Sequence, residues 1–115
     1  AGTLGIGAML DGCKQGVGGD ATLSWVDADF LDQQGVRPWA DMPVWVPPVG
    51  DGKYAGLISR ARAVKAGLTF RPTADTARDT LAYWKSLPDE RRRKPRAGLA
   101  ADKEKNVLAA WHARK

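Results

Sequence analysis

The feature that most constrains the fold is a proline-rich segment at residues 36–52. Four of the seven prolines lie there, at positions 38, 43, 47 and 48. Proline fixes φ, has no N–H donor and moves the preceding residue out of the helical region, so long helices and central strands are excluded. Trp39 and Trp45 lie among these prolines. We therefore expect an ordered aromatic loop, with short regular elements on either side.

The composition predicts one small domain over residues 1–115, without a metal site. The chain is 43% hydrophobic with five tryptophans, enough for a modest core, while 13 glycines predict short elements joined by turns. Cys13 is the only cysteine and there is one histidine, so neither an internal disulfide nor a Cys/His metal cluster can form. A cytoplasmic, non-membrane protein is expected, because a signal-peptide pattern and an apolar run of about 20 residues are both missing.

Hydrophobic periodicity predicts an α+β fold that is mainly helical, with four or five helices and two or three short strands. The expected helix starts are the N-caps Thr3, Asp27, Ser59 and Thr73, and a position near Ala100. Residues 21–26 alternate as a strand does, and residues 68–70 form a second brief extended segment. In the first helix, Gly5, Gly7 and Gly12 each cost about 1 kcal/mol relative to alanine. That helix therefore needs neighbours to stay formed.

The positive charge of the chain is concentrated near its C-terminal end. Residues 85–115 hold ten of the 18 Lys/Arg but four of the 13 Asp/Glu. The run Arg91–Arg96 forms a basic linker, residues 89–98, before the terminal helix. Nucleic acid is disfavoured as a partner because no recognition helix, zinc site or aromatic stacking sheet is visible. The competing hypothesis is a stand-alone binding module whose basic tail meets nucleic acid or an acidic protein.

Three segments carry strings typical of one enzyme family. They are residues 29–47, with Met42-Pro43-Val44-Trp45-Val46-Pro47; residues 59–81, with Gly67-Leu68-Thr69-Phe70-Arg71-Pro72 between two helices; and residues 96–112, ending Ala110-Trp111-His112. These strings resemble the C-terminal part of extended short-chain dehydrogenase/reductases, the NAD-dependent epimerase/dehydratase family, in a reductase-like subgroup. The resemblance covers most of the chain from Asp20 onward.

The resemblance implies that the chain is the substrate-side C-terminal part of an NAD(P)-dependent reductase, epimerase or dehydratase, inactive alone. In that family the preceding two-thirds of the polypeptide forms the dinucleotide-binding domain and carries a Tyr-x-x-x-Lys pair. Tyr83 is followed by Trp84 and Lys85, so a lysine one helical turn on is missing. No catalytic or cofactor-binding residue is therefore assigned. NAD or NADP belongs to the longer parent protein.

The expected partners are the dinucleotide-binding domain and a small-molecule substrate. Trp39 and Trp45 are the candidate substrate-binding residues, because stiff aromatic walls suit an apolar pocket. The alternative for both is that they hold the loop on the core. Apolar surface left without the missing domain would also promote self-association of this piece.

Other motifs have simpler explanations. Residues 16–21 fit G-x-G-x-x-A, with Asp41 about 20 residues on, but the segment leaves a helix and enters a strand, the reverse of a dinucleotide site. Arg60 and Arg71 could clamp an anion, although Arg71 is more typical of a structural ion pair, and nucleotide sugars are disfavoured as substrates. His112 is expected on the surface of a helix. Cys13 is expected to be a small buried apolar residue.

Overall fold

The computed structural model describes residues 4–114, and this part of the chain is mostly helical. Helix accounts for 54% of the structure and strand for 2%, and no sheet forms among the described residues. The expected α+β class with two or three strands is therefore wrong. The one bridge within residues 4–114 is an isolated parallel pairing of Pro38 with Met42.

The two predicted strands are absent for a physical reason. Residues 21–26 and 68–70 have no regular structure, and neither has a partner strand in the described part of the chain. Alternation of side chains decides which residues share a face, but a strand also needs a neighbour that satisfies its N–H and C=O groups. The alternating pattern in the sequence does not show whether such a neighbour is present.

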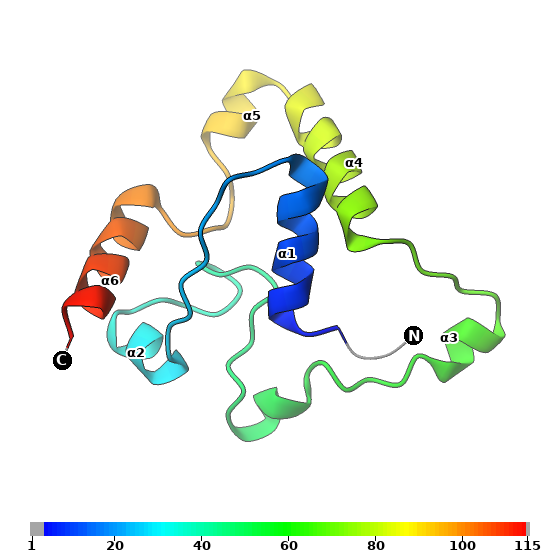
Figure 1. Cartoon of the computed structure of the whole chain (residues 1–115), viewed down its shortest axis with the longest axis horizontal. Coiled ribbons are helices and arrows are strands. Elements are labelled where there is room, and N and C mark those ends of the chain that lie inside the picture. The colour runs from blue at the N-terminus through cyan, green and yellow to red at the C-terminus, as the bar shows by residue number, and fades with distance from the viewer. Residues whose placement is uncertain (1–3, 115) are drawn as a thin grey trace. The chain divides into compact units, whose positions relative to one another are not determined.

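The chain divides into two compact units, each built from two stretches that are distant in sequence. Unit 1 is the chain up to Thr22 together with Gly56–Lys94, and unit 2 is Leu23–Ala55 together with the residues from Pro95 on. Unit 1 holds the helices α1 (Ile6–Val17), α3 (Ala61–Lys65), α4 (Thr73–Ser86) and α5 (Asp89–Arg93). Unit 2 holds α2 (Ala28–Gln33), the 3-10 helix η1 (Gly50–Tyr54) and α6 (Ala101–Ala113) (Figure 1).

Most expected helices are present, with small differences at their starts. Helix α1 begins at Ile6, and the proposed Thr3 cap lies outside the described residues. Asp27 is at the N-cap of α2 but makes no capping hydrogen bond, and Thr73 is the first residue of α4 instead of its cap. Arg60, not Ser59, is at the N-cap of α3, although the Ser59 hydroxyl accepts a hydrogen bond from the Ala61 N–H at 3.4 Å. The expected linker 89–98 is partly helical, because α5 lies in it.

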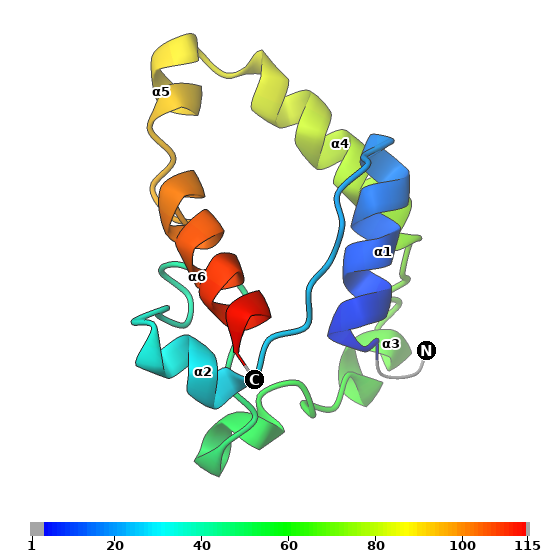
Figure 2. The same ribbon diagram turned by 60° about the vertical axis from the view of Figure 1, so that its left-hand side comes forward.

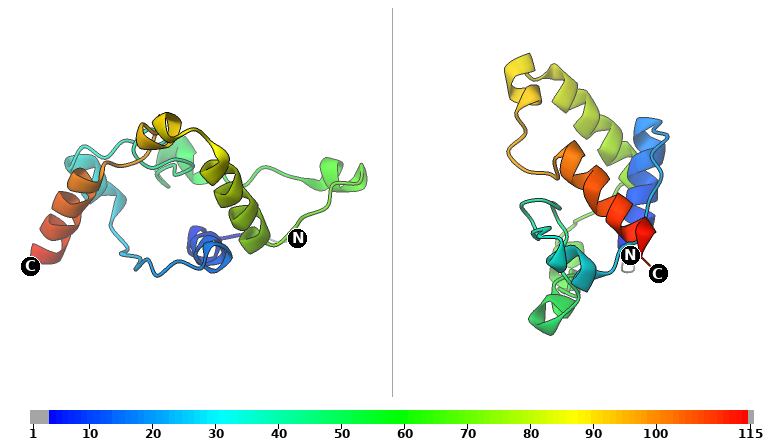
Figure 3. Two further views of the ribbon diagram at one scale, coloured as in Figure 1. Left: turned by 90° about the horizontal axis from the view of Figure 1, so that it is seen from above. Right: turned by 90° about the vertical axis from the view of Figure 1, so that its left-hand side faces the viewer.

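Helix α3 packs differently from what its sequence predicts. The spacing of Ala61, Ala63 and Val64 predicts an inward-facing side, yet all three are exposed, and Val64 keeps 48% of its surface accessible. Figure 3 shows α3 apart from α1 and α4 of the same unit. The sequence also places Gly67 where a helix end needs a left-handed residue, and there it has φ 102°.

Unit 1 is organised around the packing of α1 against α4, which lie side by side in Figures 1 and 2. Two glycines one turn apart on α1 permit this approach. A Cβ added to Gly16 would lie 2.1 Å from the Ala74 carbonyl oxygen, and one added to Gly12 would lie 3.0 Å from the Thr73 Cβ. The helix penalty of these glycines is therefore offset by close contact between the two backbones.

Unit 2 has a small apolar core. Leu31, Val36 and Val107 are buried, which brings α2, the loop after it and α6 together. Phe30 of α2 meets Trp111 of α6 edge to face, with ring centroids 5.1 Å apart at 64°. The side of α6 that carries Val107 and Trp111 is thus the side that packs.

The close approach of α1 and α4 gives a first prediction. Gly16→Ala places a methyl group where the Ala74 carbonyl lies, so the helices must separate, at a cost of about 1–3 kcal/mol for overpacking. The matched control is Gly56→Ala in the same unit, where nothing lies within 4 Å of the added Cβ. Urea unfolding followed by far-UV circular dichroism should show a lower midpoint for Gly16→Ala alone. Equal midpoints for both variants would contradict the packing.

Candidate functional site

The candidate site is the loop that follows α2 in unit 2. Gly35, at φ 67°, ends the helix, and the Val36 N–H donates to the Leu31 carbonyl at 2.9 Å. The loop then turns back on itself, because the Trp39 N–H donates to the Met42 carbonyl at 3.1 Å. It is thus an ordered loop, as the proline-rich sequence predicted.

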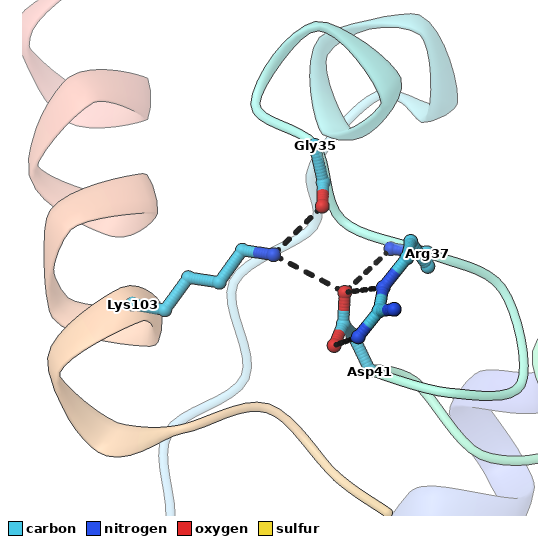
Figure 4. Close-up of polar contacts among 4 residues, drawn as sticks. All are labelled: Gly35, Arg37, Asp41 and Lys103. Carbon is cyan, nitrogen blue, oxygen red and sulfur yellow. Dashed lines mark hydrogen bonds and ion pairs between the residues drawn. The ribbon is translucent and has the colours of Figure 1, made fainter.

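A buried carboxylate, Asp41, holds this loop in place (Figure 4). Its Oδ2 accepts from the Arg37 backbone N–H at 2.8 Å and from Arg37 Nε at 3.2 Å, and its Oδ1 accepts from Arg37 Nη2 at 3.1 Å. Lys103 of α6 donates from Nζ to the same Oδ2 at 3.1 Å and to the Gly35 carbonyl at 2.7 Å. We call these four residues, Gly35, Arg37, Asp41 and Lys103, the Asp41 clamp.

Contacts within the clamp shift the pKa values of Asp41 and Arg37. Hydrogen bonds from the Arg37 side chain and backbone, and then from Lys103, lower the pKa of Asp41 far below its usual range, while burial opposes them. The hydrogen bond and charge of Asp41 raise the pKa of Arg37. Asp41 is therefore a fully occupied anion, which suits a fixed structural anchor better than proton transfer.

The two candidate tryptophans differ in how deeply they are buried. Trp45 is half-buried and packs against the core of unit 2, whereas Trp39 is 60% exposed. Trp39 and Val44 have φ of 62° and 69°, a strained region for large or β-branched side chains, and both are exposed. The loop is therefore held in a costly conformation by its neighbours. The clamp, with Asp41 between the two strained residues, is the strongest set of polar contacts there.

Trp45, but not Trp39, lines a cavity of about 240 Å³ beside α2. The cavity is walled by Ala28, Asp29, Asp32, Val36, Pro38, Trp45, Pro47 and Val49. A second cavity of about 460 Å³ adjoins it, sharing Ala28, Asp29 and Val49. The first volume is slightly below the range usual for small-molecule sites, roughly 300–1,000 Å³, and the second lies within it. Both are open hollows on the surface of unit 2.

Other candidate residues lie elsewhere and have structural roles. Arg71 forms an ion pair with Asp79 at 2.5 Å, as its structural interpretation predicted. The Arg60 guanidinium lies over the Phe70 ring, 5.3 Å from its centroid. His112 is exposed on α6, and Cys13 is partly buried on α1.

The glycine motif at residues 16–21 is a helix end. Gly16 lies within α1 against Ala74, and Gly18 closes the helix at φ 64°. Residues 19–21 have no regular structure. A dinucleotide fingerprint leaves a strand and opens a helix, whereas this segment ends a helix, and the strand expected after it is not present.

Residues 4–114 contain no group of three or more His, Cys, Asp or Glu residues that could hold a metal ion. None of their helices has both the length and the apolar content needed to cross a membrane.

Comparison with known protein families, curated proteins and solved structures gives no match in any of the three. The assignment of function therefore depends on the residues, their geometry and the resemblance of the sequence strings.

Sequence reasoning missed the clamp. Asp41 was considered solely as the acidic residue of a false dinucleotide motif, and Lys103 was not singled out. The local signal was an arginine four residues before an aspartate in a turn-forming segment, where Asp side chains commonly bond to backbone N–H groups. The contact from Lys103 spans 62 residues and has no local signal.

The lowered pKa of Asp41 predicts how acid affects unit 2. A carboxyl with a depressed pKa in the folded state stabilises above its unfolded pKa of about 4, and this contribution is lost as pH falls below it. Asp41→Asn should therefore unfold at lower urea than wild type at pH 7, with the gap narrowing as pH falls below about 4. Tryptophan fluorescence follows the unfolding. Asp51→Asn, an exposed carboxylate of the same unit, is the control. A gap that is constant with pH would refute the account of the clamp.

Proposed function

We propose that this chain is the substrate side of an NAD(P)-dependent reductase, epimerase or dehydratase, completed by a dinucleotide-binding domain outside these 115 residues. Hydride transfer and proton transfer belong to that other domain. This chain contributes part of the substrate pocket and an apolar surface on which the other domain packs.

The observation that carries the proposal is the lack of a core in unit 1. Among its described residues none is buried, although α1 and α4 each have an apolar stripe. Its exposed large apolar side chains are Leu4, Ile6, Val17, Leu57, Ile58, Val64, Leu68, Phe70 and Tyr83. An apolar helix stripe is stable when it is buried against another element. The exposed apolar surface of unit 1 is thus typical of a surface that packs against another domain.

The position of the family-like strings supports the same conclusion. The strongest of them, residues 59–81, lies wholly in unit 1. Its apolar residues Val64, Leu68 and Phe70 are about half exposed, at 48%, 47% and 51%. In the proposed protein the dinucleotide-binding domain covers these side chains. This explains why the sequence has apolar residues at positions that are exposed in this chain.

Unit 2 supports a role in substrate binding. Trp45 supplies an aromatic wall to the cavity, and the prolines Pro38 and Pro47 add stiff apolar surface. The Asp41 clamp fixes the loop before any ligand arrives, which lowers the entropy lost on binding. Asp41 and Lys103 are positioning residues in this scheme.

The chain lacks the Tyr-x-x-x-Lys spacing that the resemblance assigns to the catalytic part of the family. Neither tyrosine is followed by a lysine four positions on, since Leu87 follows Tyr83 and Ile58 follows Tyr54 at that spacing. The glycines of residues 16–21 end a helix and pack against α4. No catalytic step is therefore assigned to this chain.

The stand-alone binding module is less well supported. Arg92 already bonds Asp89 and the Leu87 carbonyl, and the Arg91 guanidinium lies 5.7 Å from the centroid of the Trp84 ring. Side chains engaged in this way are less available for phosphate groups.

The test is the intact mass of the source polypeptide, determined before purification, with NADH and NADPH binding measured by fluorescence. A longer polypeptide that binds the nucleotide, and a 115-residue chain that does not, is the expected result. A native 115-residue product without a longer precursor would contradict the proposal and favour the binding module. A steep loss of DNA or RNA binding with added salt would then identify phosphate contacts.

A further inference from the structure

Residues 57–71 of unit 1 form a segment that is exposed along its whole length. We call these residues the docking segment. Its large apolar side chains keep between 47% and 79% of their surface accessible, and they are Leu57, Ile58, Val64, Leu68 and Phe70. Apolar surface left exposed to this extent is typical of a place where a protein contacts another protein or a membrane.

The docking segment is ordered by contacts of its own. It contains α3, and the Leu68 N–H donates to the Ala63 carbonyl at 2.9 Å where that helix ends. The Arg60 guanidinium lies over the Phe70 ring, which joins the parts of the segment on either side of α3. The segment therefore has a defined conformation before a partner arrives, which lowers the entropy lost on binding.

The charge of the docking segment is of one sign. It has no aspartate or glutamate but four bases, Arg60, Arg62, Lys65 and Arg71. Arg71 is paired with Asp79, whereas neither Arg62 nor Lys65 has an ion pair within residues 4–114. Unit 1 as a whole has 11 Lys/Arg against six Asp/Glu, while unit 2 has seven of each. The net charge of +5 thus lies in the unit that has no buried residue among those described.

The accessible surface of the chain is large enough to supply an extensive interface. It amounts to 9231 Å². Two separate folded proteins of half this mass would together expose about 7,400 Å², so the chain exposes about 1,800 Å² more than two self-contained units would. One side of a standard protein–protein interface buries about 800 Å². A partner that covers the docking segment and its surroundings can therefore bury an area typical of a stable complex.

Three other occupants fit the docking segment less well than an acidic protein surface does. A second copy would bring like charges together, because the same patch faces itself in a twofold dimer. A nucleic acid would pair with the cations but leave the apolar side chains uncovered. A lipid surface favours a longer amphipathic helix with basic and apolar residues on opposite faces, and α3 has five residues.

We propose that the docking segment binds a protein surface that is apolar at its centre and carries carboxylates around that centre. Leu57, Ile58 and Val64 pack on the apolar part, and Arg62 and Lys65 pair with the carboxylates. This deepens the proposed function and rests on it for naming the partner, which is then an acidic face of the dinucleotide-binding domain. Opposite charges guide the two surfaces together and fix how they pack.

The probe is a synthetic peptide in which glutamate and leucine alternate. Its two controls have the same length, one with lysine in place of glutamate and one with serine in place of leucine. Each is titrated into the 115-residue chain at neutral pH and low salt, with the backbone N–H signals of Ile58, Val64 and Leu68 followed by NMR. The glutamate–leucine peptide should bind at least about fivefold more tightly than either control, because each control removes one of the two contributions. Added salt should weaken its binding.

The matched variants are Arg62→Gln with Lys65→Gln in the docking segment, and Arg96→Gln with Lys105→Gln in unit 2. Each double variant removes one arginine and one lysine, all four of them exposed, so the net charge falls equally. The first should lower the affinity for the glutamate–leucine peptide at least about threefold, and the second should leave it unchanged. Far-UV circular dichroism checks that both remain folded.

Several results would overturn the proposal. They are equal binding of the three peptides, no binding of any of them, or an equal loss in both double variants. Tighter binding to vesicles of phosphatidylcholine and phosphatidylserine, or to a DNA duplex, than to the glutamate–leucine peptide would also overturn it. The comparison of peptides on the wild-type chain decides the matter even if a variant fails to fold. None of these measurements needs a longer polypeptide, so the docking segment and the proposed function can fail separately.

Discussion

In unit 2, a single buried carboxylate joins segments that would otherwise have little reason to stay together. Asp41 binds both the backbone and side chain of Arg37, which closes the loop, and it binds Lys103, which ties that loop to α6. The apolar core beneath it is three buried residues. Because so little apolar surface is buried, the hydrogen bonds and ion pairs of Asp41 do much to fix the arrangement of unit 2. Breaking them would leave buried charged groups unpaired, which is costly. The loop that carries Trp45 is held in that arrangement.

Unit 1 depends on a different kind of contact. Gly12 and Gly16 let α1 approach α4 until a carbonyl group lies where a side chain would be. This is precise packing, yet it buries no residue of the unit among those described. A helix pair of 12 and 14 residues is marginal in water without further cover. A partner that covers the exposed side chains would stabilise it, and the proposed dinucleotide-binding domain is such a partner.

Most helices could be predicted from the sequence, whereas the predicted strands were wrong and the Asp41 clamp was missed. Spacing of apolar residues located α1, α4 and α6, and glycine and proline marked several ends, because these signals are local. Strands at residues 21–26 and 68–70 were wrong, since pairing depends on a neighbour that alternation does not reveal. The sequence did not distinguish Trp39 from Trp45, of which Trp45 packs against the core of unit 2 and Trp39 is exposed. Asp41 and Lys103 were missed because their contact joins positions far apart in the chain.

Unit 1 is covered by another domain in the proposed protein, and amide hydrogen exchange tests this cover directly. Exchange is measured in the 115-residue chain and in the longer source polypeptide. The amides of α1 and α4 should exchange at least about tenfold more slowly in the longer polypeptide, because cover raises the free energy of local opening. Those around the buried Val107 of α6 should change little. Equal exchange of α1 and α4 in both forms would contradict the claim.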